Sequence, residues 1–312
     1  MKKKLLTGLQ PSGQLHVGNY FGAIKPNVEL FEDHQGLFMV ADYHALTSLK
    51  DPTVLRKNIV ENVKDYLAAG LNLDNAILFQ SSSVQEHTEL AWIFNCLVTV
   101  PFLMQGHAYK DKVARGLEPN VGLFTYPMLQ AADILLYDVD VVPVGEDQRQ
   151  HVEYAREVAK KFNHTFGNTF KEPQELINES VATVPGTDGE KMSKSYGNTI
   201  PLFATREEIQ KAVMSIVTDS VGDVPENVYA IHKLYKSEDE LITLYEEKKG
   251  KYKDLKDALV EDIDTYIAPM RERRASITDE EVKKILKAGG EKAREIAGKK
   301  MEEVRKKVGV SL

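Results

Sequence analysis

The sequence is poor in cysteine and lacks long apolar runs. Among its 312 residues Cys96 is the only cysteine, which excludes an internal disulfide bond and a metal site built from several cysteines. A membrane-spanning helix needs about 20 consecutive apolar residues, and no segment approaches this length. The apolar run after the opening Met-Lys-Lys-Lys is too short for a signal peptide. We therefore expect a soluble, cytoplasmic protein with no membrane partner, and we expect Cys96 to be buried as a small apolar residue.

Charge is distributed unevenly along the chain. The net charge is −7, which argues against indiscriminate binding of nucleic acid. Residues 281–312 nevertheless carry ten Lys or Arg and five Glu, a net +5 that leaves −12 for the remainder. Apolar residues recur at helical spacing in this segment and predict an amphipathic helix, either continuous or broken near Gly289 and Gly290. Its basic face is either solvated or placed to neutralise phosphates of a nucleic acid.

Apolar runs alternate with helical patterns over the first 200 residues. Strands are predicted at 5–9, 37–41, 76–79 and 139–144, and helices at 52–69, 86–98 and 148–162. This alternation predicts an α/β fold with a doubly wound parallel sheet and ligands at the carboxyl ends of its strands. Residues 102–120 have the composition of an insertion that crosses the cleft. After residue 200 the pattern becomes helical and charged, so we expect an α/β domain over 1–200 and an all-α domain over 201–312.

The first predicted strand leads into a segment suited to binding an anion. The segment is Pro11-Ser12-Gly13-Gln14-Leu15-His16-Val17-Gly18-Asn19. A strand, a tight turn and a helix start leave backbone N–H groups free to meet a phosphate. Gly18 leaves room for a flat base against the backbone, and His16 and Asn19 can donate to phosphate or ribose oxygens.

A second segment, far downstream, supplies positive charge. Lys191-Met192-Ser193-Lys194-Ser195 places two ammonium groups three residues apart among hydroxyls, between Gly189 and Gly197. This composition is typical of a mobile cationic loop that closes on a polyphosphate. The two segments together predict a site that holds the triphosphate of ATP from both ends.

These segments resemble the two signatures of the class I aminoacyl-tRNA synthetases, the HIGH-type turn and the KMSKS loop. Asn19 stands where the first motif has its second His, a variation common in the tryptophan branch. A third block, over residues 123–127, 131–137 and 142–151, is similar to the tryptophanyl enzymes in particular. The resemblance covers roughly the whole chain. It implies a Rossmann-like synthetase fold with a helical tRNA anticodon-binding domain, a homodimer, and ATP-dependent activation of L-tryptophan followed by transfer to tRNA(Trp).

The resemblance also implies which residues bind ATP. The nucleotide-binding positions are Gln10, Pro11, Ser12, Gly18, Asn19, Gly145, Glu146, Asp147, Val184, Lys191, Met192, Ser193, Lys194 and Ser195. Asp147 would bond the ribose and Val184 would lie against the adenine. Because a carboxylate is already ionised at neutral pH, its attack on the α-phosphorus needs no general base. Lys191 and Lys194 would stabilise charge on the departing pyrophosphate, helped by His16 and Asn19. Mg²⁺ would be carried on the phosphates, with no iron–sulfur or zinc site.

For the amino acid, the resemblance implies that Asp133 accepts the indole N–H and that Gln148 and Tyr126 address the α-ammonium group. The tyrosine branch has a tyrosine on the first strand, where this chain has Leu6. A phenol oxygen facing Leu6 would lose a partner at a cost of roughly 1–3 kcal/mol. The remaining pocket positions are Val142 and Val144 as apolar walls, Gln130 as a variant of the more common Met, and His44, which either lines the pocket or is structural.

Two other functions fit part of the pattern. A nucleotidyltransferase could use the same turn to move an adenylyl group, but it would have no use for the long helical region or for Asp133. A paralogue that binds tryptophan and ATP as a sensor would not need the intact lysine loop. The basic segment at 281–312 then has two interpretations, a solvated helix face or a stripe that contacts tRNA.

Overall fold

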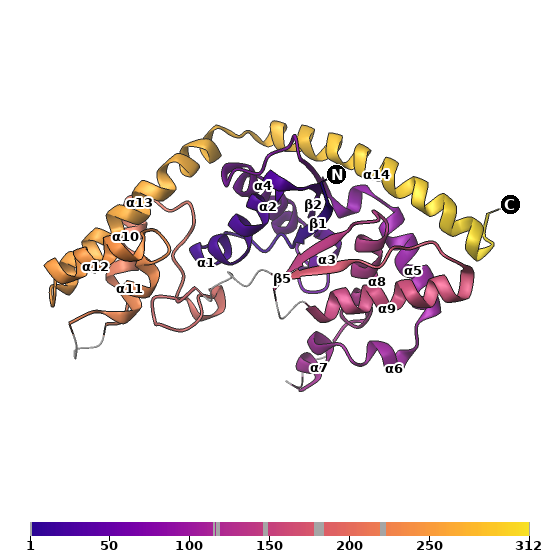
Figure 1. Cartoon of the computed structure of the whole chain (residues 1–312), viewed down its shortest axis with the longest axis horizontal. Helices are drawn as coiled ribbons and strands as arrows, with labels where there is room; N and C mark the ends of the chain where they lie inside the picture. Colours follow the sequence, from indigo (N-terminus) through magenta and orange to yellow (C-terminus); the bar gives the residue numbers. More distant parts are fainter. Residues whose placement is uncertain are drawn as a thin grey trace.

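The structure is a computed structural model that describes residues 2–114, 116, 119–145, 149–177, 184–218 and 223–311. Helices flank a central sheet, and a further group of helices lies at one end of the molecule (Figure 1). Within the described ranges, no helix has both the length and the apolar character that crossing a bilayer requires.

Five strands in the described part of the chain form one parallel sheet in the order β3-β2-β1-β4-β5. The strands are β1 (Lys4–Leu9), β2 (Gln35–Val40), β3 (Ala76–Gln80), β4 (Val141–Val144) and β5 (Gln174–Ile177). β1 pairs with β2 on one side and with β4 on the other. The strand order therefore reverses its direction at β1. The crevice at such a reversal, beyond the carboxyl ends of the strands, is where open α/β sheets bind ligands. The predicted doubly wound fold is confirmed.

Both faces of the sheet are buried, and alternate residues of each strand enter different cores. Leu5 of β1 and Phe38 of β2 belong to one apolar cluster, whereas Leu6 and Met39 belong to the other. This follows from the period of two in a strand, and continuous apolar runs are what a sheet covered on both faces requires.

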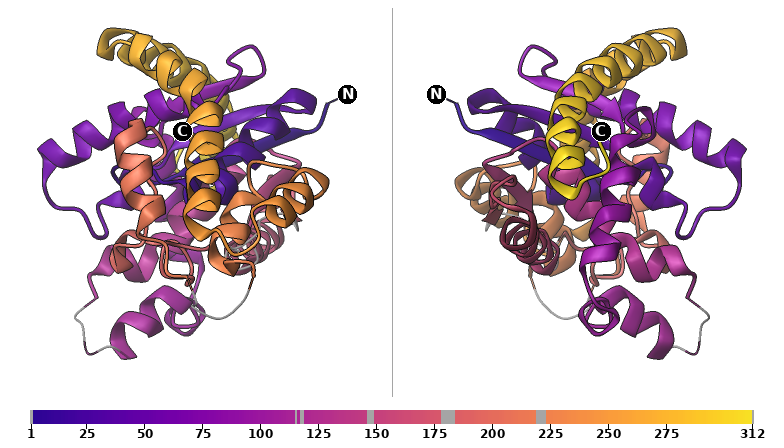
Figure 2. Two further views of the ribbon diagram at one scale, coloured as in Figure 1. Left: turned by 90° about the vertical axis from the view of Figure 1, so that its left-hand side faces the viewer. Right: turned by 90° about the vertical axis from the view of Figure 1, so that its right-hand side faces the viewer.

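The connections between the strands are helical. They comprise α1 (Val17–Asn19), a π-helical turn η1 (Tyr20–Ile24), α2 (Lys25–Asp33), α3 (Asp42–Ala45), α4 (Pro52–Ala68), a 3₁₀ turn η2 (Ser81–Ser83), α5 (Glu86–Leu97), α6 (Val100–Leu103), α7 (His107–Ala114), α8 (Val121–Leu135) and α9 (Arg149–Phe166). The segment expected to be an insertion contributes α6 and α7. Beyond the sheet lie η4 (Lys194–Tyr196), α10 (Arg206–Met214), α11 (Glu226–His232), α12 (Glu238–Glu247), α13 (Tyr252–Ser276) and α14 (Asp279–Val308). The left view of Figure 2 looks onto the end of the molecule that carries α10–α13.

The last helix returns to the sheet. α14 is one continuous helix, so Gly289 and Gly290 do not break it (Figure 1). It packs against β3 and α5. A Cβ built on Gly289 would come within 1.8 Å of the Leu78 carbonyl oxygen, so only glycine permits this approach. Before the crossing, Val282 and Leu286 belong to one core; beyond it, Ala293, Ala297, Met301 and Val304 belong to the other. α14 therefore covers the edge of the sheet and joins both cores.

Two further features bear on the sequence predictions. Cys96 is exposed on α5, so the expectation that it would be buried is wrong. The helical group is tied to the sheet region through α13, where Arg274 pairs with Glu61 of α4 at 2.6 Å. The proposed division at residue 200 stays a prediction. α14 follows residue 200 in sequence, yet it packs against β3 and α5 of the sheet region.

Candidate active site

The turn after β1 is held by side chains of α4. Asn58 Nδ2 donates to the Pro11 carbonyl at 3.2 Å, and Asn62 Nδ2 donates to the Gly13 carbonyl at 3.1 Å. Gly13 has φ of +83°, a conformation that glycine adopts without strain. These contacts fix the turn at the carboxyl end of β1, where Gln10 and Ser12 are exposed. The turn is therefore an ordered element with surface available to a ligand.

His16 and Asn19 form a reciprocal cap at the start of α1. The His16 backbone N–H donates to Asn19 Oδ1 at 3.1 Å, and the Asn19 N–H donates to His16 Nδ1 at 3.2 Å. Burial, together with the nearby charge of Lys194, lowers the pKa of His16 to about 4. The ring is thus neutral at pH 7, and because Nδ1 accepts, its proton lies on Nε2. His16 Nε2 and Asn19 Nδ2 remain donors, as a phosphate site requires.

The lysine loop lies against this turn. Lys194 Nζ donates to the Ser12 carbonyl at 2.8 Å across 182 residues of sequence. Asn198, which is buried, ties the loop together: its Oδ1 accepts from the Ser193 N–H at 2.7 Å and its Nδ2 donates to the Lys191 carbonyl at 3.2 Å. Lys191 and Ser195 are exposed beside it. The structure thus brings together the two segments that the sequence predicted to enclose a triphosphate.

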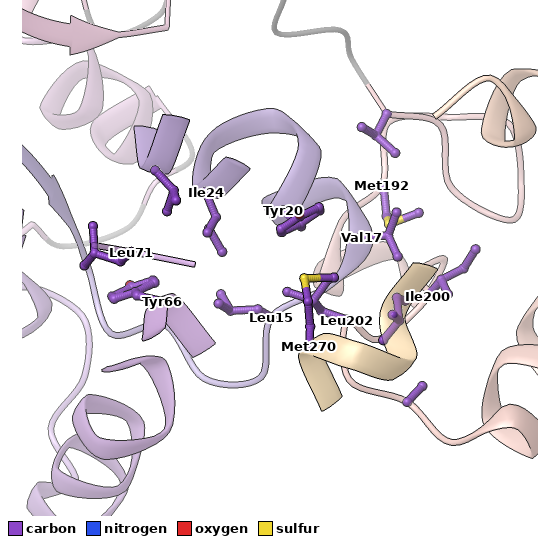
Figure 3. Packing of buried hydrophobic residues seen from close by; sticks show 14 of the residues in the cluster. Leu15, Val17, Tyr20, Ile24, Tyr66, Leu71, Met192, Ile200, Leu202 and Met270 are labelled. Carbon is purple, nitrogen blue, oxygen red and sulfur yellow. The ribbon is translucent and has the colours of Figure 1, made fainter. Parts of the chain in front are cut away.

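Met192 occupies the space at Gly18. The Gly18 N–H donates to Met192 Sδ at 3.2 Å, and a Cβ on Gly18 would lie 3.1 Å from Met192 Cβ. Figure 3 shows the Met192 side chain beside Val17 of α1. Val184, expected against the adenine, is buried in the same cluster, and its carbonyl accepts from the Met192 N–H at 2.9 Å. Both side chains pack in the core here, so a base could reach Gly18 only if Met192 moved.

Asp133 lies at the centre of a buried polar cluster. The carboxylate on α8 is 1% exposed and accepts from His44 Nε2 of α3 at 2.9 Å and from His87 Nδ1 of α5. His87 Nε2 in turn lies 2.7 Å from the Tyr137 hydroxyl. Burial alone would raise the pKa of the Asp133 carboxyl, but His87 and His44 outweigh it and lower that pKa to about 2. Asp133 is therefore an ionised acceptor held from two sides.

Of the other predicted amino-acid contacts, Tyr126 lies beside this cluster. The Tyr126 ring lies edge-on to His44, with centroids 6.3 Å apart, and its hydroxyl is 3.2 Å from His151 Nε2. Burial raises the pKa of Tyr126 to about 12, so the hydroxyl stays protonated. Leu6 and Val142 are buried in one apolar cluster, and Val144 packs against it. Gln130, on α8, is half-buried.

The site at the end of β4 is described only at Gly145, which directly follows the strand. Glu146, Asp147 and Gln148, predicted to bind ribose and α-ammonium, lie outside the described residues. Their roles stay predictions.

Sequence reasoning missed the residues that hold the site residues in place. His87 could have been found, because His87, Leu90, Ala91 and Phe94 recur at helical spacing and all four are buried. Asn58, Asn62 and Asn198 carried no such signal, since each acts on backbone groups rather than on side chains. Asn58 and Asn62 bind carbonyls that are 47 and 49 residues away in sequence, and Asn198 binds backbone groups of the lysine loop.

Comparison with known proteins identifies the family to which this site belongs. The family described as tRNA synthetases class I (W and Y) matches residues 2–294. The chain belongs to this family. The tryptophan–tRNA ligase of Fusobacterium nucleatum is 45% identical over 99% of this chain and 98% of its own length. That of Rhodopirellula baltica is 41% identical over 98% and 99%.

Solved structures of class I synthetases agree with the fold. The Campylobacter jejuni tryptophanyl-tRNA synthetase complexed with ADP and tryptophan matches with a TM-score of 0.92 and 42% identity, covering 98% of this chain and 99% of that one. The enzyme from Mycoplasma pneumoniae matches with a TM-score of 0.86 and 30% identity over 100% and 99%. The turn after β1, the lysine loop and the Asp133 cluster are thus parts of a class I synthetase.

Proposed function

We propose that this class I synthetase is a tryptophan–tRNA ligase. It would activate L-tryptophan with ATP to tryptophanyl-adenylate and transfer the acyl group to tRNA(Trp), releasing AMP and diphosphate. The observation that carries the proposal is the match over almost the whole chain to a synthetase solved with ADP and tryptophan. The buried carboxylate of Asp133 supports it, because an indole has one donor and needs one acceptor.

The chemistry follows from the geometry of the turn and the loop. The tryptophan carboxylate attacks the α-phosphorus, the bond to the pyrophosphate breaks, and charge accumulates on the leaving group. Lys194 would exchange its bond to the Ser12 carbonyl for a phosphate oxygen, with Lys191 beside it. The neutral ring of His16 would donate from Nε2. Preorganised donors of this kind stabilise a developing anion better than the ground state.

In this proposal magnesium binds to the ATP substrate and not to a metal site of the protein. Among the described residues, no group of three His, Cys, Asp or Glu side chains is placed to hold a metal ion. The donors around the turn are ammonium, imidazole and amide groups, which bind phosphate rather than Mg²⁺. A magnesium ion would therefore be carried by the phosphates of ATP, whose charge it would partly neutralise.

The proposed location is the cytoplasm, where tRNA is charged and where a lone thiol such as Cys96 stays reduced.

The proposal includes a homodimer, and one face supports it. Trp92 and Val121 are 70% and 75% exposed, which is unusual for large apolar side chains. Trp92 and Leu46 line a pocket of about 470 Å³ together with His44, Tyr126 and Leu129. A second copy covering this face would bury these side chains next to the residues assigned to the amino acid. Sedimentation equilibrium of the wild type and of Trp92→Glu tests this, with a dimer expected only for the wild type.

One assay tests the function directly. Exchange of labelled pyrophosphate into ATP should depend on tryptophan and on none of the other nineteen amino acids. Aminoacylation of tRNA(Trp) should follow. Exchange driven by tyrosine would refute the specificity, and tryptophan-dependent exchange without charging of any tRNA would favour the sensor over the ligase.

A further inference from the structure

We infer that His87 is a positioning residue for amino-acid selection, which fixes the Asp133 carboxylate as the acceptor for the indole N–H. This inference rests on the proposed function and deepens it. His87 is fully buried, so it acts on the substrate only through Asp133.

The direction of each hydrogen bond follows from the chemistry of the partners. An ionised carboxylate can only accept, so the proton between His87 and Asp133 lies on His87 Nδ1. The same argument places a proton on His44 Nε2, 2.9 Å from the other carboxylate oxygen. Burial, followed by the charge of Asp133, raises the pKa of the Tyr137 phenol far above its usual value, so its hydroxyl keeps its proton. Tyr137 then donates to His87 Nε2 at 2.7 Å.

In the series Tyr137, His87 and Asp133, each residue therefore donates a hydrogen bond to the next. Tyr137 holds His87 in the tautomer whose proton faces Asp133, and His87 holds one oxygen of Asp133. The two histidines use two of about four acceptor positions of the carboxylate, which leaves acceptor capacity for a ligand. Each ring is itself anchored: the His87 ring lies 6.1 Å from the Phe79 ring and 5.5 Å from the Tyr137 ring, measured between centroids.

Two substitutions at His87 separate this role from simple packing. His87→Asn keeps an amide N–H near the position of Nδ1, facing Asp133. His87→Gln places its amide near Nε2, facing Tyr137, and leaves Asp133 without that donor. Both remove the ring, so a purely structural role predicts similar damage from the two.

The readout compares tryptophan with an isosteric analogue in which sulfur replaces the indole N–H, 3-benzothienylalanine. We measure kcat/KM for pyrophosphate exchange with each substrate. His87→Gln should lower the value for tryptophan by roughly 10- to 100-fold, the consequence of disturbing a buried charged acceptor, and change the value for the analogue by less than about threefold. His87→Asn should keep the wild-type ratio of the two values within about threefold.

Equal losses with both substrates in His87→Gln, or a His87→Asn ratio as low as that of His87→Gln, would overturn the inference. If His87→Gln does not fold, Tyr137→Phe decides, because it removes only the hydroxyl that sets the tautomer. It should lower the tryptophan-to-analogue ratio by roughly 3- to 10-fold, and an unchanged ratio refutes the role. Failure of the proposed function is distinguishable, since the wild type would then show no tryptophan-dependent exchange.

Discussion

The Lys194 ammonium group donates to the backbone carbonyl of Ser12 at 2.8 Å, and this bond joins the lysine loop to the turn after β1. A carbonyl oxygen is a weaker partner than a phosphate oxygen for an ammonium group. The loop is thus held near the position where the triphosphate would bind, by a contact that the substrate can replace.

We expect Lys194→Ala to depress adenylate formation by roughly 10²–10³ at saturating ATP, the usual effect of removing one preorganised donor to a developing anion. Tryptophan affinity should be almost unchanged, and ATP affinity should suffer less than the rate, because the turn held by Asn58 and Asn62 remains. Pre-steady-state measurement separates the rate of adenylate formation from the affinity for ATP. Lys253→Ala, at an exposed lysine of α13, is the control. If the variant forms adenylate at the wild-type rate and only binds ATP more weakly, the loop holds ATP but does not stabilise the transition state.

Asp133→Asn should lower kcat/KM for tryptophan by at least about 10-fold while leaving the KM for ATP unchanged, because the variant replaces a charged acceptor with a neutral amide. The change keeps the size of the side chain, so the packing around it is preserved. The ratio of kcat/KM for tryptophan to that for phenylalanine is the decisive number. Asp140→Asn, which alters an acid paired with Lys171 before β4, should not change that ratio. If Asp133→Asn leaves this ratio unaltered, Asp133 does not contribute to the selection of the amino acid.

The basic residues of α14 divide into two groups with different expected effects. Lys300 pairs with Asp138 at 2.9 Å and Arg305 pairs with Glu89 at 2.5 Å, so neutralising these two should lower the melting temperature. Lys306 and Lys307 are exposed, and Lys306→Gln with Lys307→Gln should lower tRNA charging but not pyrophosphate exchange. The charging defect should shrink as salt rises, since phosphate contacts weaken with salt. A salt-independent defect, or an equal loss of exchange, counts against a tRNA-facing stripe.

Gly289→Ala should destabilise the protein by at least about 2 kcal/mol, because the new methyl group would overlap the Leu78 carbonyl. Gly298→Ala is the matched control in the same helix, where a Cβ meets nothing within 4 Å. It should stabilise by about 0.5–1 kcal/mol through helix propensity. Urea unfolding measures both. Similar effects of the two substitutions would contradict the close crossing of α14 over β3.

The lowered pKa of His16 predicts a pH dependence of stability. The unfolded chain protonates this ring below about 6.5, whereas the folded protein does so only below about 4. Between these values the unfolded state binds more protons, so stability rises with pH and is lost as pH falls through the window. His16→Gln should therefore reduce the difference in melting temperature between pH 4.5 and pH 7. His164→Gln, which removes an exposed histidine outside the site, is measured beside it for comparison.

Much of the fold could be predicted from the local pattern of apolar residues. The apolar runs at β1, β2 and β3 predicted buried strands because both faces of the sheet are covered, and Leu5 and Leu6 enter opposite cores. β5 was not predicted, since four residues with two polar side chains give no clear period. The exposure of Cys96 was missed because the stretch 90–100 around it is rich in apolar residues, and only packing decides which of these residues face outward.

The site was predictable where chemistry is encoded in adjacent residues. The turn around His16 and the loop around Lys194 are short segments, and the structure places them together. The partners of Asp133 come from α3 and α5, and these contacts depend on how three helices pack rather than on any local pattern. Met192 was predicted to contact the nucleotide, whereas in this structure it fills the space at Gly18.

The crossing of α14 over β3 also sets an order of events during synthesis. β3 is made about 200 residues before the helix that covers it, and until Ala293, Ala297, Met301 and Val304 arrive, one side of the sheet lacks part of its apolar cover. Contacts between such distant segments form late and slowly. A nascent chain that stops before α14 would expose the edge of β3 to pairing with other chains. We therefore expect misassembly chiefly in the interval between the synthesis of β3 and that of α14.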